Sequence, residues 1–393
     1  MHEISNLVKP RLNQIPSSLI RRVNQKYGAI KDIVKLTIGE PDFVTPDHIK
    51  LAAIQSILDN HSHYAPNRGT AGLLQAISDY LLRRYQLTYN PQSQLIVTNG
   101  ATEAISTVIN GMIGPNDVVL IPSPAFSLYE TVTLQNGGVP VTIDTSQNDF
   151  KLTPAVLKSY LETYAGRVKL VVLNYPNNPT GVTLTSVELQ ALAAVLKTYD
   201  VAVLSDEVYS ELSYSVDHVS IASLLPDQTL YINGVSKAYA MTGWRVGYLA
   251  GQTDVIGLLA KVHQANVATI GSLNMDAATE AFLNGDGDPR RMKAIYEERQ
   301  RYLTHALIAL GYQFVEPQGA FYVYVEVPAT FTGSANDYTD LLAEKAKIAT
   351  VPGEAFESGG SHYFRISYAT SLDNLKLAVS RLTQFVNTQS VKQ

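Results

Sequence analysis

The sequence predicts an α/β protein with a mostly parallel, seven-stranded sheet between helices and a smaller α+β region towards its C-terminal end. Short β-branched runs alternate with segments of helical periodicity through the middle of the 393-residue chain. These runs are apolar on both faces, which is typical of parallel strands covered by helices on both sides. The alternation ends at residues 285–289, where Gly, Asp and Pro predict a hinge.

Seven runs form the expected strands of the large sheet: residues 94–98, 118–122, 139–144, 169–174, 201–206, 229–233 and 244–250. Helical patterns between them cover residues 101–111, 128–135 and 186–199. After the hinge, a charged helix over residues 290–310 precedes a strand-like stretch at 320–327, a helix at 335–347 and a strand at 363–368. We therefore predict an N-terminal arm (1–44) that packs with a small C-terminal domain (286–393), and a large domain (45–285) between them.

Composition excludes several classes of function. The chain carries a net charge of −5, which disfavours nucleic acid and anionic membrane surfaces as partners. It has no cysteine, so disulfides, thiolate metal sites and a cysteine nucleophile are excluded. His61 and His63 have no further ligand candidates nearby, and no metal site is expected. Without a signal-peptide pattern or a segment of ~20 apolar residues, the expected location is the cytoplasm.

Polar segments follow four of the predicted strands, at the edge where open α/β sheets bind ligands. They cover residues 98–103, 174–181, 206–209 and 236–245. In the first, Gly100, Ala101 and Thr102 open a helix, whose free N–H groups favour a phosphate, although a plain strand-to-helix turn has the same pattern. In the third, Asp206 ends an apolar strand, where a cationic ring nitrogen would offset its burial; a turn aspartate is the alternative.

Three cationic residues complete the candidate site. Lys237 lies in a small polar loop, and its amine becomes nucleophilic if burial and neighbouring cations lower its pKa. Arg245, eight residues later, is suited to a phosphate dianion. Arg365 is a lone charge near the start of an apolar strand and is suited to a substrate carboxylate, with an interdomain salt bridge as the alternative.

The segments closely resemble the class I/II aminotransferases of fold type I, which depend on pyridoxal 5′-phosphate (PLP), and the similarity extends from about Pro10 to Val386. The most specific matches are NNPTG (177–181), SKAYAMTGWR (236–245) and RISYA (365–369). The resemblance implies the fold type I architecture, with PLP bound to the large domain. It is closest to the aromatic and aspartate aminotransferase subgroup.

The resemblance also implies roles for individual residues. Lys237 would hold PLP as a Schiff base and carry the proton, while Asp206 would pair with the pyridine nitrogen. Asn178 and Tyr209 would hydrogen-bond the phenolic oxygen of PLP, and Phe126 would stack on its ring. The expected phosphate ligands are Gly100, Ala101, Thr102, Ser236 and Arg245. Many family members carry a phosphate-binding serine where this chain has Gly234, and Ser236 would take over that contact.

Substrate and partner follow from the same resemblance. Arg365 would bind the α-carboxylate with help from Gly39 and Asn178, and Ile15 would form part of a lid over the substrate side chain. Tyr64 would reach the phosphate of the neighbouring subunit, which implies a homodimer with shared active sites.

The expected activity is ping-pong transamination of an aromatic amino acid with 2-oxoglutarate. Some aspartate-type relatives place a lysine at the position of Thr102, which this chain lacks. Aspartate, branched-chain amino acids and N-acetyl-diaminopimelate remain alternative substrates, and a PLP-dependent carbon–sulfur β-lyase is an alternative reaction. A DNA-binding regulator built on this fold would need an added domain, for which the residues before position 45 are too few.

Overall fold

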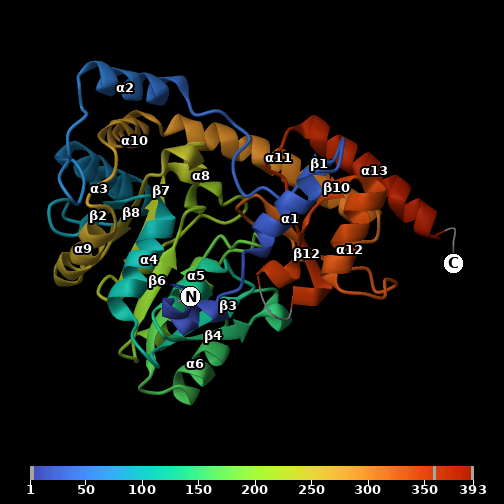
Figure 1. The fold of residues 1–393 in the computed structure, drawn as a ribbon, viewed down its shortest axis with the longest axis horizontal. Helices are drawn as coiled ribbons and strands as arrows, with labels where there is room; N and C mark the ends of the chain where they lie inside the picture. The colour runs from blue at the N-terminus through green and yellow to red at the C-terminus, as the bar shows by residue number, and fades with distance from the viewer. Residues whose placement is uncertain (1–3, 357–359, 391–393) are drawn as a thin grey trace.

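The computed structural model describes residues 4–356 and 360–390 and is centred on a seven-stranded sheet (Figure 1). The strand order is β2-β8-β7-β6-β5-β3-β4. The strands are β2 (Leu95–Thr98), β3 (Val118–Ser123), β4 (Val139–Asp144), β5 (Val168–Asn174), β6 (Ala202–Asp206), β7 (Thr229–Gly234) and β8 (Gly247–Ala250). Only β8 pairs antiparallel, with β2 and β7, so the predicted mostly parallel sheet is confirmed.

Helices cover both faces of this sheet because alternate strand residues point to opposite sides. On one face, Ile96, Val119 and Leu204 pack with α4 (Ala101–Met112), α5 (Leu128–Gln135) and α9 (Thr253–Val267). On the other, Val97, Val118 and Val203 pack in two further clusters. The helices of that face are α3 (Ala71–Tyr85), α6 (Pro154–Thr163), α7 (Ser186–Leu196) and α10 (Ser272–Asn284).

Four predicted boundaries are wrong by three residues or more. The charged helix expected from residue 290 already begins at Gly287, so residues 287–289 of the predicted hinge are helical. The strand expected over 244–250 begins only at Gly247, because Thr242–Trp244 forms a 3-10 turn and Arg245 has a left-handed backbone with φ of 55°. The helix expected over 186–199 ends at Leu196. The helix expected over 335–347 is α12 (Ala335–Leu341) followed by a π-helical turn at Leu342–Ala346, and it ends where Lys347 adopts a left-handed conformation.

The C-terminal part has its own small sheet of order β11-β12-β9, formed by β9 (Tyr322–Glu326), β11 (Val351–Pro352) and β12 (Tyr363–Ser367). The helices α11 (Gly287–Ala309) and α13 (Leu372–Ser390) pack beside it. Figure 1 shows α11, in orange, running from beside α10 towards these elements.

The N-terminal segment lies against this C-terminal part. It contains α1 (Leu19–Gly28) and β1 (Val34–Lys35), and β1 pairs in parallel with β10 (Ile348–Ala349). The Ser367 N–H donates to the Leu36 carbonyl at 2.9 Å, which places residue 36 beside the small sheet. The division of the chain at residues 44/45 and 285/286 stays a prediction.

Two ion-pair clusters tie the elements around the large sheet. His48 on α2 (Asp47–Leu58) lies between the carboxylates of Glu280, 2.7 Å from Nδ1, and Asp288, 2.9 Å from Nε2. Because carboxylates only accept hydrogen bonds, both ring nitrogens must donate, and His48 is an imidazolium. Burial opposes that charge, but the bonds to Asp288 and Glu280 outweigh it and raise the pKa of His48. The imidazolium thus joins α2 to the start of α11.

The second cluster surrounds the buried carboxylate of Glu211, just after β6. Arg84 donates to it from Nε at 3.0 Å and from Nη2 at 2.6 Å. The hydroxyls of Tyr80 and Tyr85 donate at 2.6 and 2.7 Å. Burial opposes ionisation of Glu211, but these donors outweigh it and lower the pKa of the carboxyl. In the described part of the chain, no helix is long and apolar enough to cross a membrane.

Candidate active site

A cavity of about 300 Å³ lies where β5, β6 and β7 end and α4 begins, and the small sheet closes its far side. Its volume is at the lower end of the range of small-molecule sites. Most of the residues singled out in the sequence line it: Gly39, Ala101, Thr102, Phe126, Asn178, Asp206, Tyr209, Ser236, Lys237, Arg245 and Arg365. The fold therefore gathers in one place residues that are up to 326 positions apart (39 to 365).

Three of the predicted residues lie elsewhere. Gly100 is just behind the cavity wall, next to Arg245. Tyr64 is 93% exposed on this protomer's surface and does not line the cavity. Ile15 also lies outside the lining, where the N-terminal segment contributes Ile20 of α1 instead. Ile20, five residues later in the sequence, thus lines the cavity where the prediction named Ile15.

Lys237 is on the short helix α8 (Val235–Ala238), directly after β7. Its Nζ donates to the Gly39 carbonyl at 2.6 Å. Burial lowers the pKa of this amine to about 8; Glu40 opposes the shift, and Arg365 and Arg245 add to it. A larger fraction of the amine is therefore uncharged near neutral pH, which is the form that adds to a carbonyl.

Asp206 ends β6 and is 4% exposed. Its Oδ2 accepts from the Tyr129 hydroxyl at 2.6 Å, and its Oδ1 accepts from the Val208 N–H at 3.4 Å. Burial raises the pKa of this carboxyl to about 6, because the donors only partly offset the loss of water. None of the ion pairs found among the described residues includes Asp206. A cationic ring nitrogen would supply the missing partner.

An anion cradle is formed at the start of α4. Gly100 has φ of +76°, and a Cβ atom there would overlap with Arg245 Nη2, so only glycine admits the guanidinium this close. Arg245 is fixed by Nη1, which donates to the Thr242 carbonyl at 3.0 Å, and by Nη2, which donates to Asn99 at 3.3 Å. A Cβ on Gly247 would approach the Ala101 nitrogen to 2.5 Å. The guanidinium and the first N–H groups of the helix together suit a phosphate.

Arg365 on β12 is 2% exposed and packs against two aromatic rings. Its Cζ is 4.3 Å from the ring centre of Tyr322 and 4.8 Å from that of Phe356. Nη1 donates to Asn178 Oδ1 and Nη2 to the Thr37 carbonyl, both at 2.8 Å. Nε has no hydrogen-bond partner among the described residues. Because its oxygen is engaged, the Asn178 amide leaves its Nδ2 donor for a ligand.

The donor set fits PLP. Lys237 is an amine of lowered pKa, Asp206 is a buried carboxylate suited to a cation, and Arg245 lies beside a helix N-terminus suited to a phosphate. Arg365 is a further cation in the lining and is suited to bind a carboxylate. These are the four chemical groups that PLP and an amino acid present.

Sequence reasoning missed several residues of the cavity: Ile20, Glu40, Ile105, Tyr129, Asn174, Val208, Thr242 and Tyr322. Asn174 could have been found, since it is the last residue of a predicted strand. Tyr129 lies three residues after Phe126 and so on the same side of the first helical turn, which is a weak signal. Tyr322 carries no signal, because buried aromatic residues are common in strands.

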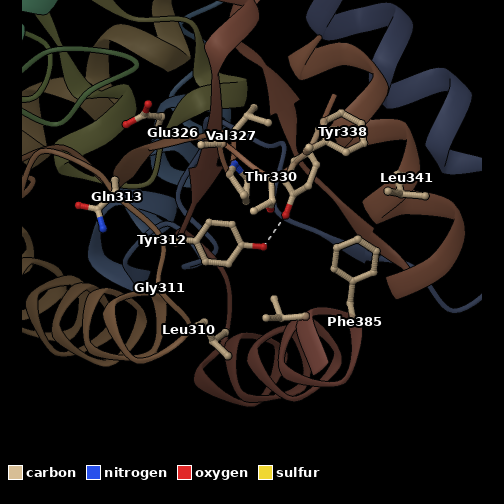
Figure 2. A pocket seen from close by; sticks show the side chains of 14 residues that line it. Leu310, Gly311, Tyr312, Gln313, Glu326, Val327, Thr330, Tyr338, Leu341 and Phe385 are labelled. Atoms are coloured by element: carbon tan, nitrogen blue, oxygen red, sulfur yellow. Dashed lines mark hydrogen bonds between the residues drawn. The ribbon is translucent and has the colours of Figure 1, made fainter. Parts of the chain in front are cut away.

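A second cavity, of about 640 Å³, is larger but has different chemistry. Figure 2 shows it in the C-terminal part, where the Tyr312 and Tyr338 hydroxyls meet at 2.6 Å and Phe385 faces them. Its described lining includes no lysine, arginine or histidine. Without an amine for a Schiff base or a cation for a phosphate, this cavity is not suited to PLP.

Comparison with known proteins agrees with the geometry. The family model described as "Aminotransferase class I and II" matches residues 31–382. A Bacillus subtilis (strain 168) protein named "Probable N-acetyl-LL-diaminopimelate aminotransferase" is 40% identical over 98% of this chain and 96% of its own length.

Solved structures agree as well. The aspartate aminotransferase of Thermus thermophilus, solved with maleate, superposes with a TM-score of 0.91 at 33% identity over 98% of this chain and 100% of that one. The aromatic aminotransferase of Pyrococcus horikoshii OT3 superposes with a TM-score of 0.88 at 32% identity, covering 94% of this chain and 99% of that one. The family and the fold are thereby shown, whereas the relatives' names differ in substrate.

Proposed function

We propose that this chain, which belongs to the class I and II aminotransferase family and is therefore a PLP-dependent enzyme, transfers the amino group of an aromatic amino acid to 2-oxoglutarate. The observation that carries the proposal is the single cavity that holds Lys237, Asp206 and Arg365 together. Bound PLP supplies an electron sink for the charge that develops at the substrate Cα. The residues around it bind, orient and move the proton.

Each residue's proposed task follows from its contacts. The Lys237 amine, with its pKa of about 8, holds the cofactor and then takes and returns the Cα proton. Asp206 keeps the ring nitrogen protonated. Asn178 Nδ2 and the Tyr209 hydroxyl donate to the phenolic oxygen of PLP, and Arg365 binds the α-carboxylate of both substrates.

The remaining contacts hold the cofactor in place. Phe126 lies in the cavity wall and stacks on the ring, while Ser236, Arg245 and the N–H groups of Ala101 and Thr102 bind the phosphate. Gly100 serves by its lack of a side chain. Gly39 assists at the α-carboxylate.

The preference for an uncharged side chain rests on the charges of the cavity. The described lining contains three cations, Lys237, Arg245 and Arg365. Each has a task above, so this protomer leaves no cation for the distal carboxylate of aspartate. The described lining also includes two apolar side chains, Ile20 of the N-terminal segment and Ile105 of α4.

N-acetyl-diaminopimelate is the second candidate substrate. It is favoured by the relative of 40% identity, whose name refers to N-acetyl-LL-diaminopimelate. The far end of this molecule carries an acetamide, for which the described lining offers Glu40 and Thr242, and a carboxylate, which this protomer leaves without a cation as it does that of aspartate.

We also propose a homodimer with shared active sites. Tyr64 is exposed, and the outer surface of α2 presents Leu51, Ile54, Ile57 and Leu58 to solvent. A second copy that covered these apolar side chains would bury them and bring its Tyr64 to the phosphate cradle. The cytoplasmic location remains a prediction.

An absorption experiment tests the proposed function. The purified holoenzyme is mixed separately with phenylalanine, tyrosine, aspartate, N-acetyl-LL-diaminopimelate and cystathionine, and 2-oxoglutarate is then added. We expect an aromatic amino acid to convert the cofactor to the pyridoxamine form, and 2-oxoglutarate to restore the original spectrum. Conversion by aspartate or N-acetyl-LL-diaminopimelate alone would contradict the proposed aromatic substrate. Pyruvate release from cystathionine without an oxoacid would indicate a carbon–sulfur β-lyase.

A further inference from the structure

We infer that Tyr322 is a positioning residue that joins the cofactor's hydroxyl partner, Tyr209, to the carboxylate-binding Arg365, with its hydroxyl acting on the first and its ring on the second. The inference rests on the proposed function, because it assigns a part in that same site to a residue that has none above. Tyr322 lies on β9 and lines the cavity.

The hydroxyl of Tyr322 is held in one place. It is 2.8 Å from the Tyr209 hydroxyl, and both side chains are buried. A Cβ on Gly39 would approach Tyr322 Oη to 2.6 Å, so the glycine backbone covers the hydroxyl from the other side. That same backbone accepts from Lys237 Nζ at 2.6 Å. The Tyr322 hydroxyl is therefore fixed between Tyr209 and the segment that holds the lysine.

The direction of this hydrogen bond has a chemical consequence. When the Tyr209 hydroxyl donates to the phenolic oxygen of PLP, its own oxygen can only accept, so Tyr322 becomes the donor. Successive hydrogen bonds polarise one another, and the donation from Tyr322 strengthens the one from Tyr209. With PLP bound, the donation from Tyr322 would stabilise the ionised phenolic oxygen, and the imine that PLP forms with Lys237 would take up a proton only at lower pH.

The ring of Tyr322 has a separate task. Its ring centre lies 4.3 Å from the Arg365 guanidinium carbon, closer than that of Phe356 at 4.8 Å. Two hydrogen bonds, to Asn178 and Thr37, fix the guanidinium within its plane. The two rings pack against the guanidinium at distances that are favourable for a cation. Tyr322 thus helps to hold the position in which Arg365 meets a carboxylate.

Several charged side chains lie around the hydroxyls of Tyr209 and Tyr322, and the Tyr322→Phe substitution removes none of them. Lys237 Nζ is 5.8 Å from the ring centre of Tyr209, and Arg365 and Asp206 also act on the Tyr209 pKa. Glu40 and Arg245 act on Lys237. Burial keeps the pKa of Tyr322 raised, so its hydroxyl stays protonated.

The test separates the hydroxyl from the ring. In the Tyr322→Phe holoenzyme, we expect the apparent pKa of the visible absorption band to rise by about 0.5–1 unit, because one hydrogen bond is lost. The KM for the amino acid should stay within about twofold. In Tyr322→Leu, which also lacks the ring, the KM for amino acid and oxoacid should rise by about 3–30-fold.

Tyr296→Phe is the matched control. The Tyr296 hydroxyl is also buried in the C-terminal core but has no hydrogen-bond partner among the described residues. This variant should titrate as wild type does. If the visible band of Tyr322→Phe titrates with the same pKa as that of the wild type, the inference is overturned and the proposed function is not. A wild-type holoenzyme with no pH-dependent visible band would overturn the proposed function and the inference with it.

Discussion

Removal of the Tyr129 hydroxyl tests whether its hydrogen bond keeps Asp206 ionised, the form that binds a cationic ring nitrogen. The hydroxyl donates at 2.6 Å to a carboxylate whose pKa is already about 6. A hydrogen bond to a charged group is worth about 1.5–3 kcal/mol, and 1.36 kcal/mol corresponds to one pKa unit. In Tyr129→Phe, the pKa of Asp206 should therefore rise by about 1–2 units, to roughly 7–8.

The expected effect on cofactor binding depends on pH. At pH 7 about nine-tenths of Asp206 is ionised in the wild-type apoenzyme, against roughly a tenth to a half in the variant, so the Kd for PLP should rise about 2–10-fold. At pH 9 both carboxyls are ionised, and the difference should nearly vanish. The fluorescence of Trp244, the single tryptophan, provides the titration signal. The same Kd ratio at both pH values, or the same effect in Tyr296→Phe, would refute the reasoning.

Two further predictions concern stability. Replacing Arg84 with methionine leaves the buried Glu211 carboxylate without its cation and should lower the free energy of unfolding by about 3 kcal/mol or more, measured by urea denaturation; a loss below about 1 kcal/mol would contradict the cluster. The raised pKa of His48 means that its contribution is complete below about pH 6.5 and is lost as pH rises through the folded-state pKa. His48→Gln should therefore lower Tm by a few degrees or less at pH 5.5 and by almost nothing at pH 9, whereas an equal loss at both pH values would show that His48 is not an imidazolium.

The large sheet could be predicted because its signal is local. Each buried strand is a short apolar run, and the polar residues that follow it, such as Asn178 after β5 and Lys237 after β7, mark one edge of the sheet. The start of β8 could not be predicted, since the left-handed backbone of Arg245 is imposed by its contacts with Thr242 and Asn99. The contact with Asn99 joins residues that are 146 positions apart, so the sequence around Arg245 does not predict it.

The charged residues of the cavity were predicted better than the aromatic and apolar residues that complete its lining. Arg365 could be found because a charge in an apolar strand needs a reason, and Lys237 because it follows a buried strand at the edge where such sheets bind ligands. Tyr129 and Tyr322 could not, because their tasks come from hydroxyl contacts with Asp206 and Tyr209 across 77 and 113 residues of sequence. Ile20 replaces Ile15 in the lining because α1, which begins at Leu19, brings its first turn to the cavity.

Identification of the lysine that carries PLP tests the central claim most directly. The holoenzyme is reduced with borohydride, which fixes the imine bond, and its peptides are mapped by mass spectrometry. We expect the cofactor-derived mass on Lys237, and none in a Lys237→Ala variant treated in the same way. Attachment of the cofactor to another lysine, or retention of the label in Lys237→Ala, would contradict the account.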